Sequence, residues 1–274
     1  MPILLGPMLA DQNPLTAAVP EEILLPNAPL LRVVARVNFP VIVSIAKAEF
    51  IAPFQEALRP TYPVLRPDQT LNLVLSGVPV VAAPAPQTTW RFSDASDKWR
   101  VSLATNFMAI ETTAYVSRSD FIERLRVVAS ALTEHVNPQV ADRVGLRYID
   151  RITGDALKNL GKYVRPEVMG ILATPAATQV RHSMSESLFT LPQDKRRFQV
   201  RWGQIPPNAT VDPAAIDPIG EPSWILDLDM FCAGSRPFEA KVLVDEVGEY
   251  ADRIYTFFRW AVTDEFLKLY GGQI

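Results

Sequence analysis

Two segments of the chain show the alternation of apolar and polar positions that is typical of a half-buried β-strand. In residues 31–39 every odd position is apolar, whereas Arg32, Arg36 and Asn38 fall on even positions. Residues 144–152 alternate in the same way, with apolar or aromatic side chains at Val144, Leu146, Tyr148 and Ile152. Because successive side chains of a strand point to opposite faces, both segments predict strands with one buried face.

Two other segments have helical spacing. After Ser117 and Asp120, which resemble a capping box, apolar residues recur at Phe121, Leu125, Val128, Leu132 and Val136. Asn137-Pro138 should end that helix. Near the C-terminus, a longer stripe runs through Leu243, Val247, Tyr250, Ile254, Phe257 and Ala261. Thr263 should begin a final short helix, with Gly271 just after it.

The remaining segments complete an α+β chain. A short helix is expected at 49–58, a strand at 70–82, and a hairpin of residues 88–93 and 99–115 around a turn at 94–97. The second strand of that hairpin is long enough to need a bend or a bulge. Three further strands are expected at 179–190, 198–205 and 224–231, before the long C-terminal helix.

The order of these elements suggests two interlocked halves of mainly antiparallel sheet backed by helices. Residues 1–29 form a proline-rich lead-in. Residues 30–153 have the order β-α-β-β-β-α-β, which is the ferredoxin-like (split βαβ) order with one extra strand. Residues 154–274 add a second antiparallel sheet and the long helix, packed as one unit with the first half.

Composition supports a folded chain. Of 274 residues, 24 are Pro and 12 are Gly, and 14 of the prolines lie in residues 1–86. Residues 87–137 contain neither, so the prolines separate elements rather than mark disorder. The scarcity of glycine also argues against a glycine-rich phosphate loop, and no such motif is present.

Charge and cysteine content restrict the function classes. The formal net charge of −3 excludes a globally basic nucleic-acid binder but allows a local basic patch. One cysteine excludes a disulfide framework and a cysteine-based zinc cluster. The N-terminus lacks the charge pattern of a signal peptide, and no long apolar window predicts a membrane span, so we expect a cytoplasmic protein without membrane contacts.

Three stretches carry a family resemblance: residues 106–115 leading into the helix at Asp120, residues 144–152, and residues 257–265. Together they resemble a sporadically distributed, functionally uncharacterised prokaryotic family of about this whole length. The shared motifs are strand and helix patterns. The resemblance therefore implies a cytoplasmic α+β unit and supplies no active-site residues.

The most distinctive polar pattern is a row of arginines. Arg143, Arg147 and Arg151 recur at intervals of four, so they project from one face of a strand, as do Arg32 and Arg36 on the first strand. In a ferredoxin-like sheet these two strands are neighbours. Guanidinium groups on one face suit phosphates or carboxylates. The alternative is that each arginine pairs with a carboxylate, or that this face meets the other half.

Asp227 and Asp229 share one face of another predicted strand. Paired carboxylates can hold Mg²⁺ beside a phosphate, with Glu111 or Asp150 as candidate third ligands, as in a phosphodiesterase or nuclease. The alternative is a solvent-facing pair, or partners for the arginines above. No catalytic motif or general acid–base pair stands out, so no catalytic residue is assigned.

The leading hypothesis is a non-enzymatic binding protein without a cofactor. Its arginine-bearing face would recognise a protein partner or an anionic ligand, with nucleic acid as one such ligand. A second copy of the chain is another candidate partner. The metal-dependent phosphodiesterase is one alternative, and a structural adaptor that docks a partner on its aromatic C-terminal helix is another.

Overall fold

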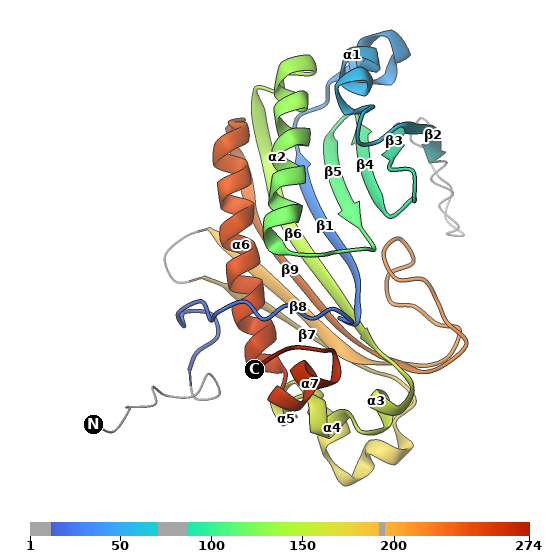
Figure 1. The fold of residues 1–274 in the computed structure, drawn as a ribbon, viewed down its shortest axis with the longest axis vertical. Coiled ribbons are helices and arrows are strands. Elements are labelled where there is room, and N and C mark those ends of the chain that lie inside the picture. The colour runs from blue at the N-terminus through green and yellow to red at the C-terminus, as the bar shows by residue number, and fades with distance from the viewer. Residues whose placement is uncertain (1–11, 71–86, 192–194) are drawn as a thin grey trace, which may run out of the picture.

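A single antiparallel sheet of nine strands forms the centre of the computed structural model, which describes residues 12–70, 87–191 and 195–274 (Figure 1). The strand order is β2-β3-β4-β5-β1-β6-β9-β8-β7. The strands span Leu30–Asn38 (β1), Val64–Thr70 (β2), Gln87–Ser93 (β3), Trp99–Ala104 (β4), Phe107–Thr112 (β5), Val140–Ile152 (β6), Ser183–Thr190 (β7), Arg196–Ile205 (β8) and Ser223–Pro237 (β9).

Helices cover one face of this sheet. The two longest, α2 (Arg118–His135) and α6 (Ala240–Ala261), lie next to each other across it (Figure 1). The others are α1 (Ala48–Leu58), α3 (Gly154–Lys158), α4 (Leu160–Tyr163), α5 (Pro166–Met169) and α7 (Asp264–Leu269), with 3₁₀ turns η2 (Val43–Ala46), η3 (Gly170–Ala173) and η4 (Pro175–Gln179). None of the helices in the described part of the chain has the length and apolarity needed to cross a bilayer.

The long helices form where the apolar spacing predicts them. Ser117 caps α2, because its hydroxyl oxygen accepts a hydrogen bond from the Asp120 backbone N–H at 3.2 Å. Phe121, Leu125 and Leu132 on the predicted stripe are all buried. Thr263 caps α7 in the same way, with its hydroxyl oxygen 3.3 Å from the Phe266 nitrogen. The predicted short helix at 49–58 corresponds to α1.

Strand β6 joins the two predicted halves in one continuous sheet. The second, separate sheet predicted for residues 154–274 is therefore wrong, because β9, β8 and β7 extend the first sheet from the free edge of β6. Strand β6 pairs antiparallel with β1 on one side and with β9 on the other. Val33, Ala35 and Val37 of β1 are buried beneath the helices, which confirms the alternation in the sequence. Arg32 and Arg36 therefore lie on the opposite face, which we call the open face.

Two segments differ from the sequence-based prediction. Strand β2 lies in a segment where no strand was predicted; among the described residues it has a partner only on its β3 side, and such a position tolerates Pro67. The strand predicted at 99–115 is two strands, β4 and β5, which turn at Thr105-Asn106. The strand predicted at 70–82 lies, apart from Thr70, outside the described residues.

Two extended segments pack on the sheet and its helices. The N-terminal strap (residues 12–29) lies along α6, where Arg253 donates hydrogen bonds to the carbonyls of Pro14 and Ala17. The β8–β9 loop (residues 206–222) folds over the open face instead. Its Ile216 is fully buried against Ile149 and Ile225 of the sheet. The open face is therefore partly covered by a loop rather than by a helix.

Candidate anion-binding site

Arginines from β1 and β6 are brought together on the open face. The register places Arg36 opposite Gly145 and Arg143 opposite Asn38, so these side chains emerge beside one another. Arg147 lies opposite Val34, two residues along each strand from the Arg36–Gly145 pair. Since directly paired residues share a face, four of the five predicted arginines surround the same stretch of sheet. Arg151 lies on this face further along β6, opposite Ile225.

The β8–β9 loop turns this surface into a cleft of about 260 Å³. Its charged lining consists of Arg32, Arg36, Arg143, Arg147, Glu111, Asp212 and Asp229. Asp212 comes from the loop, as does the apolar Ala214, and the other charged residues come from adjacent strands. The cleft thus has a rigid floor of paired strands and one wall that the loop supplies.

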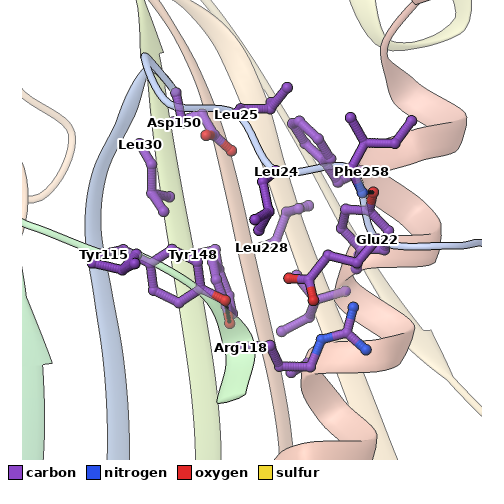
Figure 2. A pocket seen from close by; sticks show the side chains of 16 residues that line it. Glu22, Leu24, Leu25, Leu30, Tyr115, Arg118, Tyr148, Asp150, Leu228 and Phe258 are labelled. Carbon is purple, nitrogen blue, oxygen red and sulfur yellow. Dashed lines mark hydrogen bonds between the residues drawn. The ribbon is translucent and has the colours of Figure 1, made fainter. Parts of the chain in front are cut away.

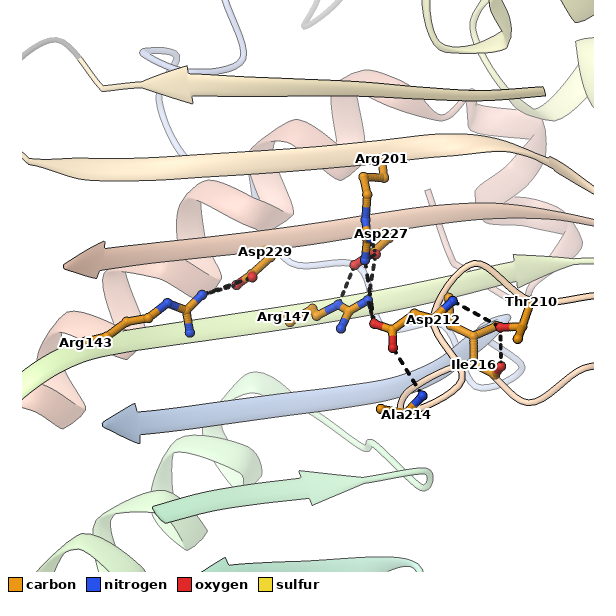
Figure 3. Close-up of polar contacts among 9 residues, drawn as sticks. All are labelled: Arg143, Arg147, Arg201, Thr210, Asp212, Ala214, Ile216, Asp227 and Asp229. Carbon is orange, nitrogen blue, oxygen red and sulfur yellow. Dashed lines mark hydrogen bonds and ion pairs between the residues drawn. The ribbon is translucent and has the colours of Figure 1, made fainter. Parts of the chain in front are cut away.

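Arg147 is the best-anchored of the arginines (Figure 3). Its Nε and Nη2 atoms donate to the two carboxylate oxygens of Asp227 at 2.7 and 2.8 Å, a bidentate pair. Arg201 of β8 contacts the same carboxylate, and Asp212 lies 2.8 Å from Arg147. Burial alone would lower the pKa of Arg147, but the hydrogen bonds and charge of Asp227, then those of Asp212, raise it. Arg147 therefore holds the loop and Asp227 in place.

Arg143 lies over Gly145 and has both a carboxylate and an aromatic partner. Its Nη2 atom is 3.1 Å from Asp229, and its guanidinium lies 4.4 Å from the centre of the Phe231 ring. A Cβ atom at Gly145 would come within 2.9 Å of the Arg143 Nη1 atom and 3.2 Å of Phe231. The absence of a side chain at Gly145 is what lets this guanidinium lie flat on the sheet.

Arg36 has no carboxylate partner among the described residues. Its Nε atom donates to the Asn38 side-chain oxygen at 3.1 Å, and its guanidinium stacks 3.9 Å from the centre of the Phe107 ring. Burial and then the nearby charge of Arg143 lower the pKa of Arg36. Two neighbouring guanidiniums, of which only Arg143 is paired with a carboxylate in the described ranges, leave the positive charge of Arg36 uncompensated.

The remaining two predicted arginines have structural partners. Arg32 lies 3.4 Å from Glu111, which also pairs with Arg100 at 3.1 Å. Arg151 donates from Nη2 to the Asp217 carbonyl at 2.6 Å, so it fastens the β8–β9 loop and does not line the cleft. The sequence-based alternative, in which arginines pair with carboxylates, thus describes Arg32, Arg143 and Arg147 but not Arg36.

The environment of Asp227 and Asp229 weighs against a metal ion there. Asp227 is 2% exposed and its oxygens are occupied by Arg147 and Arg201, while Asp229 faces Arg143. Cations on every side repel a metal ion and leave few lone pairs to bind one. In the described ranges no three His, Cys, Asp or Glu side chains are placed to hold a metal.

Neither proposed third ligand completes such a site. Asp150 pairs with Leu226 in the register, so it lies on the helix-covered face, opposite to Asp227. Its expected role beside the two aspartates is therefore wrong. Glu111 lies on the open face, but its carboxylate is held by Arg32 and Arg100.

Sequence reasoning missed three charged residues of this region. Arg201 alternates with the buried Phe198 and Val200, so the period of two could have placed it on the open face. Arg100 lies between the buried Trp99 and Val101, so the same period of two could have placed it on the open face. Asp212 lies in an irregular loop, where no pattern predicts its position.

Comparisons with known proteins add no further constraint. No family model, no curated protein and no solved structure matches this chain. The functional argument therefore rests on the geometry of the cleft.

Proposed function

We propose that this protein binds a phosphate-bearing anion in the cleft between Arg36, Arg143 and the β8–β9 loop, as a binding protein rather than an enzyme. The single observation that carries this proposal is the uncompensated charge of Arg36 beside Arg143. Like charges held close together raise the free energy of the empty site. An anion placed between them would remove that repulsion.

The two guanidiniums are also held in place before any ligand arrives. Each is stacked on an aromatic ring, Phe107 or Phe231, and each is hydrogen-bonded to a neighbouring side chain. Such stacking fixes the plane of the guanidinium and reduces the entropy lost on binding. Guanidinium groups bind phosphate oxygens through two parallel hydrogen bonds, which a fixed plane favours.

The size and charge of the cleft favour a small phosphate group over a long polyanion. Four arginines and three carboxylates line it, which leaves one excess positive charge. A volume of about 260 Å³ accommodates pyrophosphate or the phosphates of one nucleotide. A single-stranded nucleic acid is the larger ligand that presents the same chemistry, and duplex recognition would need a more extended basic surface.

Several expectations from the sequence are retained as proposals. We propose that residues 30–153 form a ferredoxin-like unit, which the neighbouring order β6-β1-β5-β4 supports. We also propose that the protein is cytoplasmic and that it belongs to the uncharacterised prokaryotic family that its sequence resembles. A protein partner, a second copy of the chain and an adaptor role for α6 stay predictions.

Calorimetric titration with pyrophosphate tests the proposal. The wild-type protein should bind saturably, and Arg36→Ala should weaken binding by about tenfold, the value of one lost charge-assisted contact. Arg66→Ala is the matched control, because Arg66 lies on the edge strand β2, pairs with Asp97 and is remote from the cleft lining. Its affinity should equal that of the wild type.

A second arm distinguishes a nucleotide from a nucleic acid. Binding of a ten-nucleotide single-stranded RNA is measured by fluorescence anisotropy at several salt concentrations. If RNA binds tightly and the affinity falls steeply with salt, the ligand contacts several phosphates. If pyrophosphate binds and RNA does not, the cleft takes a single phosphate group. Absence of binding by both probes, or equal binding by wild type and Arg36→Ala, would overturn the proposal.

A further inference from the structure

A second cavity lies on the opposite, helix-covered face of the sheet, beneath the N-terminal strap. It has a volume of about 100 Å³. The strap, β6, β9 and α6 enclose it, and its apolar walls include Leu25, Leu30, Leu228, Ile254 and Phe258 (Figure 2). The strap is fixed over it by hydrogen bonds from two of its backbone N–H groups: Ile23 donates to the Tyr255 side-chain hydroxyl, and Asn27 donates to the Tyr270 backbone carbonyl.

Asp150 projects its carboxylate into this cavity (Figure 2). The residue is only 6% exposed, and its carboxylate accepts no hydrogen bond and forms no ion pair within the part of the chain that the structure describes. A buried carboxylate without a partner is costly, and a native protein seldom retains one without a role. Burial and then the charge of Asp227 on the other face raise the pKa of Asp150 to about 7.

The cavity is polar at its other end as well. Figure 2 places Asp150 at one end and Glu22 with Arg118 at the opposite end. Tyr148 and Tyr115 lie between them, with their hydroxyl oxygens 3.2 Å apart and their rings edge to face. Glu22 is exposed, so this end faces the solvent. A ligand would therefore enter past Glu22 and bring its head group to Asp150.

We infer that this cavity binds a small primary amine, whose ammonium group pairs with Asp150 while its apolar chain fills the space between the strap and α6. An ammonium group has three donors and the charge that a carboxylate needs when it is buried. The aromatic rings of Tyr115 and Tyr148 add a surface that favours a cation. A carboxylate head group would be repelled by Asp150, and a neutral alcohol would leave the charge uncompensated.

The volume limits the size of the amine. An apolar cavity of about 150 Å³ accepts benzene, so this cavity has room for about five non-hydrogen atoms. This inference is independent of the anion-binding proposal. The two sites lie on opposite faces of the sheet and share none of their lining residues.

Binding should depend on pH through Asp150. The titratable and charged groups facing this region are Glu22, Tyr115, Arg118, Tyr148, Tyr255 and Tyr270, with Asp227 acting through the sheet. Burial raises the pKa of Tyr115, Tyr148 and Tyr270, so these phenols stay neutral between pH 5 and 8. Below a pH of about 7 the free protein has a protonated Asp150, so the affinity for an ammonium ion should fall about tenfold per pH unit.

The test uses three probes of one shape and different charge: n-butylamine, 1-butanol and butyrate. Their binding is followed by NMR shifts of the isoleucine and leucine methyl groups. At pH 8 the amine should bind about tenfold more tightly than the alcohol, and butyrate should not bind. At pH 5 the preference for the amine should be lost, while the affinity for the alcohol should be unchanged. This comparison uses the wild-type protein, so it does not depend on the folding of any variant.

A pair of variants isolates the carboxylate. Asp150→Asn keeps the shape of the side chain and should bind amine and alcohol equally at pH 8. Asp155→Asn removes the charge of an exposed aspartate outside the cavity and should leave the preference unchanged. Equal binding of the three probes by the wild-type protein, or an amine preference that survives in Asp150→Asn, would overturn the inference. Absence of methyl shifts with all three probes would also overturn it, because the cavity would then hold only water.

Discussion

Arg36 and Arg143 lie beside each other on the open face of the sheet, and of these two only Arg143 has a carboxylate partner among the described residues. Arg32 and Arg147 on the same two strands, and Arg201 on β8, have charges that are matched by Glu111, Asp212 and Asp227. Because Arg36 lacks a carboxylate partner in the described part of the chain, it is a candidate binding residue, whereas the matched arginines form structural ion pairs.

Gly145→Ala should weaken the anion site without unfolding the protein. The new methyl group would come within 2.9 Å of the Arg143 Nη1 atom, so the guanidinium must leave its place on Phe231. We expect pyrophosphate affinity to fall severalfold in calorimetry. The free energy of unfolding should change by less than about 1 kcal/mol, because alanine is also the better strand residue.

Gly248→Ala is the control for that variant, because nothing lies within 4 Å of the Cβ atom it adds in α6. It should stabilise the helix by about 1 kcal/mol and leave pyrophosphate affinity unchanged. If both glycine variants bind pyrophosphate like the wild type, the position of Arg143 does not matter for binding.

Asp227→Asn should be more destabilising than Asp229→Asn. Asp227 is buried between Arg147 and Arg201, so its neutralisation leaves these two partly buried guanidiniums with only Asp212 as a charged partner among the described residues, at a cost of about 3 kcal/mol. Asp229 is 23% exposed and, in the described ranges, forms an ion pair only with Arg143, so we expect a loss of about 1 kcal/mol. Urea denaturation of the two variants measures the difference, and equal losses would contradict this ranking.

The same two variants test the metal alternative. If Asp227 and Asp229 serve as arginine partners, calorimetric titration of the wild type with Mn²⁺ should give no saturable heat that the double variant lacks. A saturable Mn²⁺ signal that disappears in Asp227→Asn with Asp229→Asn would instead support the phosphodiesterase hypothesis.

Asp150→Asn should stabilise the protein, and the gain should depend on pH. The pKa of Asp150 is about 7 in the folded protein and near 4 in the unfolded chain, so the folded state binds the proton more tightly. Wild-type stability therefore falls as pH rises from about 4 to 7. Asparagine does not titrate, so the gain should be about 4 kcal/mol at pH 8 and about 1–2 kcal/mol at pH 5.

Chemical denaturation of wild type and Asp150→Asn at both pH values measures this gain. The control is Asp155→Asn, whose exposed carboxylate should give little difference at either pH. A gain for Asp150→Asn that is the same at pH 5 and pH 8 would show that Asp150 is ionised at both.

Ile216→Ala should release the β8–β9 loop from the open face. Ile216 is fully buried against Ile149 and Ile225, so its truncation should cost about 2–4 kcal/mol. Limited proteolysis should then cut within residues 206–222 faster than in the wild type. Val242→Ala, at an exposed position of α6, should change neither stability nor cleavage, and an uncut loop in Ile216→Ala would contradict the anchoring role.

Local patterns predicted the elements that have a clear period or a clear cap. The alternation in β1, the Ser117 cap of α2 and the apolar stripe of α6 all rest on neighbours in the sequence, and all are present. Strand β2 was missed because Pro60, Pro63 and Pro67 interrupt this segment, although only Pro67 lies within the strand, at a position that tolerates it. The β4–β5 turn was missed because Thr105-Asn106 lacks glycine and proline.

Pairing across the sheet could not be read from the sequence. Whether Arg147 faces Asp227 depends on the register between β6 and β9, which long-range packing sets. The position of Asp212 depends on an irregular loop that folds back over the sheet. Asp150 was accessible to sequence reasoning, because it shares the even positions of Val144, Leu146 and Tyr148 and so belongs to the buried face.

The most direct test of the anion-binding account is an NMR titration that follows the arginine side-chain Nε–Hε signals as pyrophosphate is added. The account predicts saturable shifts for Arg36 and Arg143, with Arg66 on the edge strand unaffected. Both signals should reach half of their maximal shift at the same pyrophosphate concentration. Shifts that are absent, or that are as large for Arg66 as for Arg36, would contradict the central claim.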